Sequence, residues 1–186
     1  PEASDPIRGP SAGTAGLMGY DLGWDYARYG VPLPGDLSLE VPYLGQGYKE
    51  GREHWRGRTR VADVFVRKWL RMRGSAFRRG RVIHESVTPD LLRAIATDCC
   101  PVTREALSYP TVGTDHKPDP RVLWSIDRLS NDAGYIAGNL VVMSELANKA
   151  KGSMSFPQIY SNAVRLLKTG QALGGWTACS GRAWPA

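Results

Sequence analysis

The spacing of apolar and polar residues along the chain predicts several helices and one pair of short strands. Apolar residues recur at helical spacing in most segments, whereas two short apolar runs flank a Gly/Asn-rich stretch, which is typical of a hairpin. Residues 31–46 are rich in Pro and Gly and are predicted to form a loop. The helices are expected over residues 16–30, 60–79, 88–97, 144–151 and 155–168, and the strands over residues 121–126 and 140–143.

The helix expected over residues 60–79 has two distinct faces at 100° per residue. One face is apolar and suited to packing, and the other is a row of arginines. Like charges at i,i+4 spacing repel one another, so we favour contact of this row with nucleic acid over a merely solvated face. The apolar face holds Val61, Phe65, Trp69, Met72 and Ala76, and the arginine row holds Arg60, Arg67, Arg71 and Arg78.

A short motif occurs twice in the N-terminal half. Gly19-Tyr20-x-x-Gly23 matches Gly47-Tyr48-x-x-Gly51 with an offset of 28 residues. Because glycine has no side chain, two such helical turns could approach each other closely. Chance is the alternative explanation for a motif with only two copies.

Length and composition suit one globular domain, or a core domain with an appendage. No apolar run reaches the roughly 20 residues needed to cross a bilayer, and no secretory signal is visible, so we expect a cytoplasmic protein without a membrane partner. The three cysteines, two of them adjacent, form a poor disulfide framework and are expected to be thiols. Oligomeric state is left open.

Basic charge is concentrated in one segment. The net charge is +6, but residues 52–81 hold eleven Lys and Arg against Glu53 and Asp63. Such a concentration indicates a polyanionic partner. We therefore predict four regions: a flexible tail over 1–15, a helical arginine-rich nucleic-acid-binding region over 16–97, a hairpin unit with a C-terminal helix over 98–170, and a loosely ordered tail over 171–186.

A set of polar residues surrounds the predicted hairpin. Asp127 ends the first strand, and Asn148 lies in the following helix, which can fold back towards that strand. A carboxylate and an amide oxygen are hard ligands that suit Mg²⁺. Asn139 opens the second strand, where its amide can tie the loop in shape, and Lys149 and Lys151 place positive charge where a phosphate would approach.

These residues resemble the HNH nucleases, also called ββα-metal or His-Me finger nucleases. The motifs are Asp127-Arg128-Leu129, Asn139-Leu140 and Asn148-x-x-Lys151, and Cys100-Pro101-Val102-Thr103 is similar to an upstream element of a phage-type branch of the family. The resemblance covers about residues 100–152. It implies a mainly α protein with a small ββα-metal finger, an α+β arrangement. It also implies that Asp127 and Asn148 hold Mg²⁺ or Mn²⁺, and that Asn139 shapes the loop.

The chain departs from the family at the position of the general base. That residue is a histidine in the family and is Arg128 here. Arginine does not lose its proton in proteins, so it cannot accept one from water, although it could clamp a phosphate. The base could come from His116, metal-bound hydroxide could act without one, or the finger could be catalytically inactive.

Three functions are compatible with these observations. The first is a metal-dependent DNA endonuclease or nickase, most suited to double-stranded DNA. The second is a catalytically inactive DNA-binding protein or transcriptional regulator on a degenerate HNH scaffold. The third is an RNA-binding basic module in which Trp24, Tyr48 or Trp55 stacks on bases, with core packing as the alternative role of these rings.

Overall fold

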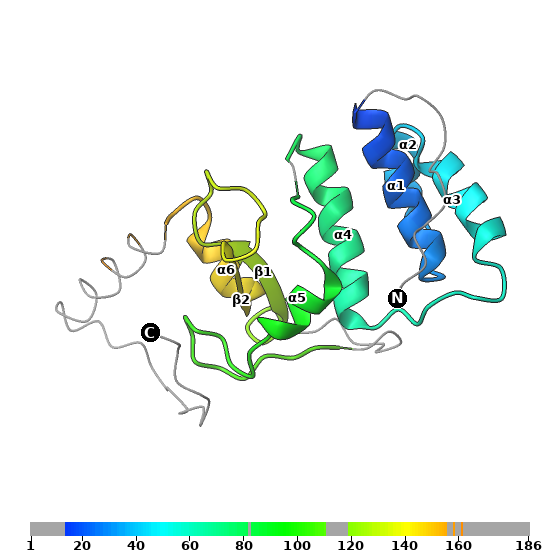
Figure 1. Cartoon of the computed structure of the whole chain (residues 1–186). Coiled ribbons are helices and arrows are strands. Elements are labelled where there is room, and N and C mark those ends of the chain that lie inside the picture. The colour runs from blue at the N-terminus through cyan, green and yellow to red at the C-terminus, as the bar shows by residue number, and fades with distance from the viewer. Residues whose placement is uncertain (1–13, 82, 111–118, 156–157, 159–160, 162–186) are drawn as a thin grey trace. The chain divides into compact units, whose positions relative to one another are not determined.

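The computed structural model describes residues 14–81, 83–110, 119–155, 158 and 161, which belong to two compact units (Figure 1). The chain divides between Val82 and Ile83, so residues 83–97 belong with the hairpin and not with the arginine-rich region. The first unit contains α1 (Thr14–Arg28), α2 (Gly35–Glu40), α3 (Leu44–His54) and α4 (Val64–Arg78). The second contains α5 (Pro89–Ala94), β1 (Trp124–Arg128), β2 (Leu140–Ser144) and α6 (Glu145–Lys151).

The prediction of helices combined with one small antiparallel sheet is confirmed at this level. Within the residues described, no helix is long and apolar enough to cross a membrane. Helix α1 begins at Thr14, so the last two residues of the predicted N-terminal tail are helical. The rest of that tail, the C-terminal tail and most of the helix expected over 155–168 lie outside the described residues.

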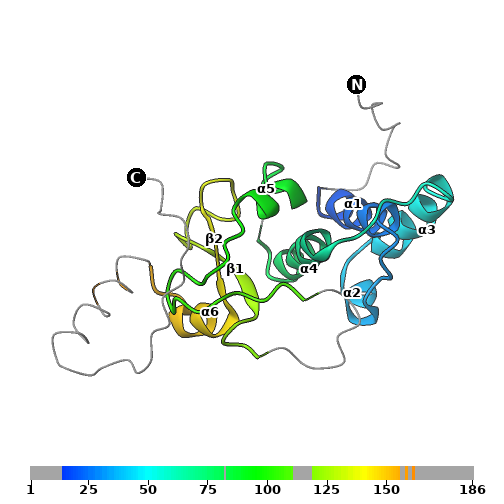
Figure 2. The same cartoon turned by 90° about the horizontal axis from the view of Figure 1, so that it is seen from below.

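Helices α1 and α3 pack against each other through the glycines of the repeated motif. A Cβ atom added at Gly47 would lie 2.1 Å from the Tyr20 carbonyl oxygen, and one added at Gly23 would lie 2.1 Å from the Leu44 carbonyl oxygen. A Cβ atom added at Gly51 would lie 2.9 Å from the Ala27 Cβ and 3.2 Å from the Trp24 Cα, a close but less severe contact. Residues later in α1 contact residues later in α3, so the two helices run parallel. They lie side by side in both views (Figures 1 and 2).

The core of the first unit joins these helices to α2 and α4. Helix α2 lies in the segment predicted as a loop, and that prediction was wrong because Leu37 offers an apolar anchor that is 4% exposed. Gly74 of α4 leaves room for the Leu37 side chain, since an added Cβ atom would lie 2.8 Å from it. The buried residues of this core are Leu22, Tyr26, Val31, Leu37, Val41, Leu44, Val66 and Leu70.

Helix α4 begins later than predicted. Asp63 is its N-cap, and its Oδ1 accepts a hydrogen bond of 2.9 Å from the Val66 N–H, so Arg60 and Val61 precede the helix. Val61, expected to be part of the apolar face, is 90% exposed. The buried residues of α4 are Val66 and Leu70 together with Gly74 and Ala76, and Ala76 belongs to the predicted face. Trp69, also from that face, packs beside Val66 and Leu70.

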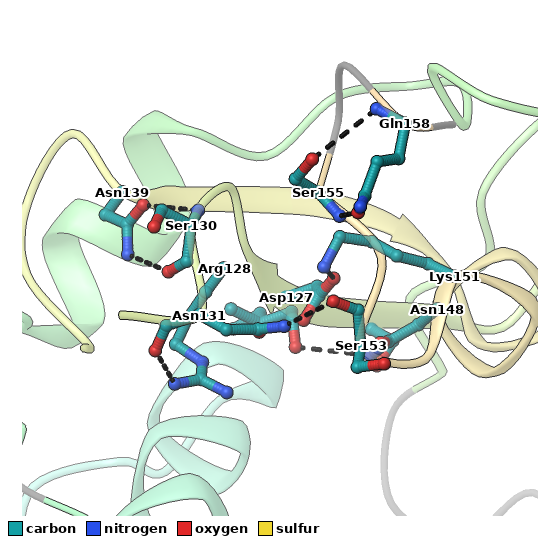
Figure 3. A network of polar contacts seen from close by, with 12 residues as sticks. Asp127, Arg128, Ser130, Asn131, Asn139, Asn148, Lys151, Ser153, Ser155 and Gln158 are labelled. Carbon is teal, nitrogen blue, oxygen red and sulfur yellow. Dashed lines mark hydrogen bonds and ion pairs between the residues drawn. The ribbon is translucent and has the colours of Figure 1, made fainter. Parts of the chain in front are cut away.

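The second unit is built on the β1–β2 hairpin and the helix that follows it. The strands pair antiparallel, with Asp127 opposite Val141, and β1 begins three residues later than predicted. Thr88, at the start of the helix expected over residues 88–97, caps α5, and its hydroxyl accepts a hydrogen bond from the Leu91 N–H. The Ser155 N–H and hydroxyl exchange hydrogen bonds with Gln158, which makes a capping box (Figure 3).

The start of α6 is fixed to the chain around the first strand. The N–H groups of Glu145 and Leu146 donate to the carbonyl oxygens of Leu123 (2.7 Å) and Pro120 (2.9 Å). The Ala147 N–H donates to the hydroxyl of Ser144, the N-cap (3.2 Å). Three N–H groups that a helix leaves unpaired at its start are thus satisfied by protein atoms.

The Cys100 thiol lies in the core beside this junction. Its sulfur accepts hydrogen bonds from the N–H groups of Ser144 (3.3 Å) and Thr103 (3.5 Å). Burial raises the pKa of the Cys100 thiol, but hydrogen bonding by Thr103 and Ser144, through side chain and backbone, outweighs it, so the pKa lies below its ordinary value. Cys100 is a free thiol as expected, whereas Cys99 is disulfide-bonded, contrary to the prediction.

We expect Gly47→Ala to destabilise the protein, because the new methyl group would overlap the Tyr20 backbone. Overpacking of this kind costs about 1–3 kcal/mol. Gly45→Ala is the matched control on the same helix, because its Cβ atom would have its nearest neighbour at 4.0 Å. The urea midpoint should fall for Gly47→Ala and stay or rise for Gly45→Ala. Equal midpoints for the two variants would contradict the close packing of α1 and α3.

Candidate functional site

Helix α6 lies along one face of β1. Successive side chains of a strand point to opposite faces, so Ser125 and Asp127 share one face, and Arg128 belongs to the other. The Asn148 side-chain amide donates to the Ser125 hydroxyl (2.9 Å) and to the Ile126 carbonyl oxygen (3.4 Å). The helix therefore presents Asn148 to the strand face that carries Asp127.

Lys151, one turn after Asn148, reaches back to Asp127 (Figure 3). Its ammonium nitrogen lies 2.7 Å from Asp127 Oδ2, and the side chains are 1% and 12% exposed. The two groups form a buried ion pair, and neither charged atom makes a hydrogen bond to another residue of the described part of the chain. We expected Lys151 to face a phosphate, and the structure corrects this: Lys151 is an internal counter-ion.

The two predicted metal ligands are thus brought to the same face of β1. Asn148 is anchored through its NH₂ group, and its Oδ1 makes no hydrogen bond to the described residues. The ion pair with Lys151 is formed at Oδ2 of Asp127, and Oδ1 is the other oxygen of that carboxylate. Within residues 14–155, apart from the undescribed positions, no group of three or more His, Cys, Asp or Glu residues could hold a metal ion. A cation on this pair would therefore keep several waters, as Mg²⁺ does.

Arg128 has a structural role on the opposite face. It is 8% exposed, and its Nη1 donates to the Asn131 carbonyl oxygen (2.7 Å). Its guanidinium carbon lies 5.1 Å from the centre of the Tyr135 ring. Arg128 therefore holds the hairpin loop and does not reach into the space beside Asp127, where a phosphate clamp was considered. His116, the other candidate base, lies outside the described residues.

Asn139 ties the hairpin loop to itself. Its Oδ1 accepts from the Ser130 N–H (2.8 Å), and its NH₂ group donates to the carbonyl oxygens of Ser130 (2.8 Å) and Gly134 (2.6 Å). This is the loop-shaping contact that the sequence predicted. Asn131 links the same loop to the segment that follows α6, because its side chain donates to the Ser153 carbonyl oxygen (2.9 Å, Figure 3).

The arginine row on α4 is less available than predicted. Arg78 pairs with Asp36 (3.0 Å) and Glu40 (3.6 Å) of α2. The Arg67 Nε donates to the Ala62 carbonyl oxygen (3.3 Å). Arg71 and Arg60 are exposed, although Arg60 lies outside the helix.

Two contributors to the site region were not identified from the sequence. Ser125 anchors Asn148, and the period of two along a strand would have placed it beside Asp127. Glu145 pairs with Lys149 at 2.5 Å, so this exposed lysine, predicted to meet a phosphate, has an acidic neighbour four residues earlier. In the first unit, Asp36 and Glu40 of α2 were not identified as partners of Arg78, because the segment that holds them was predicted to be a loop.

Comparisons of the chain with protein-family models, with curated proteins and with solved structures find no match. The likeness to HNH nucleases therefore rests on the motifs themselves and on the order of hairpin and helix. The arrangement of Asp127, Asn148 and Lys151 is the feature from which a function can be inferred.

We expect Lys151→Met to destabilise the protein strongly, because it leaves the Asp127 carboxylate buried without a counter-ion. Breaking a buried pair costs about 3–5 kcal/mol. Lys149→Met, at a lysine that is 68% exposed on the same helix, should change the stability little.

A double-mutant cycle with Asp127→Asn measures the coupling directly. The double variant should recover part of the stability lost in Lys151→Met, as read from the free energy of unfolding in urea. Additive effects of the two substitutions would show that the ion pair is absent in solution.

Proposed function

We propose that the unit formed by β1, β2 and α6 is a divalent-cation site of a nucleic-acid-cleaving protein, a DNA endonuclease or nickase. The observation that carries this proposal is the attachment of α6 to the Asp127 face of β1 through Asn148 and Lys151. It brings the side chains of Asp127 and Asn148 to the same face of β1, and further contacts hold each of them.

Each residue has a distinct role in such a site. Oδ1 of Asp127 and Oδ1 of Asn148 would be the protein ligands of Mg²⁺ or Mn²⁺, and waters would complete the shell. Lys151 would orient the carboxylate from the second oxygen, as outer partners of metal ligands do. Its positive charge would also weaken cation binding. The bound ion would stabilise charge on the phosphate and on the leaving oxygen.

Water activation is the weak step of this chemistry. Arg128 cannot accept a proton and lies on the other strand face. General-base catalysis typically contributes 10²–10⁴-fold, so cleavage without it would be slow but measurable. His116 stays a candidate for this step.

A second function, a non-cutting DNA-binding protein, is favoured by one specific observation. The buried Lys151 ammonium group already balances the negative charge of Asp127, so the carboxylate does not need a metal ion as its counter-ion. On this alternative the hairpin and helix are a scaffold, and the basic residues of the first unit supply the affinity.

Nicking of supercoiled plasmid tests the first function. Wild-type protein should nick with Mg²⁺ or Mn²⁺ and not with EDTA. Asp127→Ala and Asn148→Ala should each lose more than the roughly 10–100-fold that removal of an outer-shell partner costs. Asp132→Ala is the control, because Asp132 is an exposed acid in the same hairpin loop.

The outcome separates the two functions. Wild-type protein that binds DNA but does not nick it with either metal would refute the enzyme and support the binding protein. Nicking that survives both site variants would place the chemistry elsewhere. Folding of each variant is checked by its thermal unfolding midpoint, so that loss of nicking is not mistaken for loss of structure.

A further inference from the structure

The first unit contains a cleft of about 610 Å³, in the size range of ligand sites. It lies between the C-terminal end of α1, helix α3 and the segment that follows α3. Ala27 and Gly30 contribute from α1 and its end, and Tyr48 contributes from α3. The cleft lies entirely within the first unit.

Positive charge dominates the lining of this cleft. Lys49, Arg52 and Arg56 line it, and their spacing places them on successive turns of one helix face and its continuation. All three are exposed, and none forms an ion pair within the described part of the chain. Glu53 is the acid among the lining residues, so the four charged groups sum to a positive patch.

Glu50, the other acid on this part of α3, is engaged by hydrogen bonds from Tyr20 and Gln46. Both oxygens of Glu50 accept hydrogen bonds, from the Tyr20 hydroxyl (2.6 Å) and from the Gln46 amide (3.0 Å). The hydrogen bond from Tyr20, followed by that from Gln46, lowers the pKa of Glu50, so the carboxylate is charged but engaged. The electrostatic interaction of Glu50 with Lys49 is the last and smallest cause of this lowering, and Glu50 forms no ion pair with Arg52 or Arg56 within the described part of the chain.

This availability contrasts with two arginines of α4, Arg73 and Arg78. Arg78 is paired with two acids of α2, and Arg73 is paired with Asp25, which is 9% exposed. Those charges offset acids of the same unit. Lys49, Arg52 and Arg56 form no ion pair within the described residues, so their charges can bind an external anion.

Aromatic rings accompany the cations. The Arg52 guanidinium carbon lies 5.9 Å from the centre of the Tyr48 ring, at the cleft. Next to it, the Trp55 ring has Arg28 at 5.4 Å and Arg58 at 5.9 Å. A positively charged groove with aromatic side chains is the combination that binds single-stranded nucleic acid without sequence preference.

We infer that this cleft binds the phosphodiester backbone of a nucleic-acid strand, with Arg52 and Arg56 contacting phosphates and Tyr48 available to a base. The inference deepens the proposed function by locating substrate binding, and it takes nucleic acid as the partner from that proposal. It does not depend on cleavage.

Fluorescence anisotropy of the full chain with a labelled single-stranded 20-mer tests the inference, with the matching duplex as a second probe. All titrations contain EDTA, so metal binding and cutting play no part. We expect Arg52→Gln/Arg56→Gln to weaken binding of the single strand at least tenfold. The slope of log K against log salt should become shallower by about 1.4, at about 0.7 for each lost phosphate contact on a single strand.

The control removes the same charge elsewhere in the first unit. Arg79→Gln/Arg81→Gln alters two exposed arginines away from the cleft and should leave the salt slope near that of the wild type. An equal loss in both double variants would show a general charge effect and overturn the cleft. So would unchanged binding of a folded Arg52→Gln/Arg56→Gln variant.

The result is distinguishable from the outcome of the nicking assay. A protein that does not nick plasmid but loses affinity in the cleft variant retains the cleft and loses the enzyme. A protein that nicks plasmid while the cleft variant binds as tightly as wild type retains the enzyme and loses the cleft. Stronger loss on the duplex than on the single strand would reassign the ligand to double-stranded DNA and overturn the choice of a single strand.

Discussion

The first turn of α6 is attached to the chain around β1 by hydrogen bonds from its N–H groups, each of which has an acceptor in the protein. Glu145 and Leu146 donate to the carbonyl oxygens of Leu123 and Pro120, and the Ser144 hydroxyl caps the third N–H. A seven-residue helix is too short to be stable alone in water, so these contacts specify both its existence and its direction. Asn148 and Lys151 then fall over β1 by helical periodicity.

The same attachment decides what the site can offer chemically. A free helix N-terminus attracts anions. The first N–H groups of α6 already donate to protein oxygens, so a phosphate would have to be recognised by side chains. The charge closest to Asp127 is the buried Lys151 ammonium group. Such pairs recover at best part of the cost of desolvating both ions, which makes Asp127 and Lys151 more informative about function than about stability.

Local signals in the sequence predicted much of this structure, and tertiary partners account for what they missed. Thr88 and Ser144 stand at helix starts, and the glycine repeat does mark a close helix contact. Helix α2 was missed because Leu37 is its one buried residue, in a segment rich in Pro and Gly, and because its acids pair with Arg78, a partner distant in the sequence. The role of Lys151 was predicted wrongly because the sequence does not reveal that the folded chain places the Asp127 carboxylate next to its ammonium group.

The glycine contact between α1 and α3 has a consequence for the cleft that opens at their ends. Gly51 fits against Ala27, and Ala27 forms part of the cleft wall. Backbones in such close contact cannot slide or rotate past each other without a steric collision. The wall is therefore preorganised, and a ligand entering it would be spared the entropic cost of ordering the two helices.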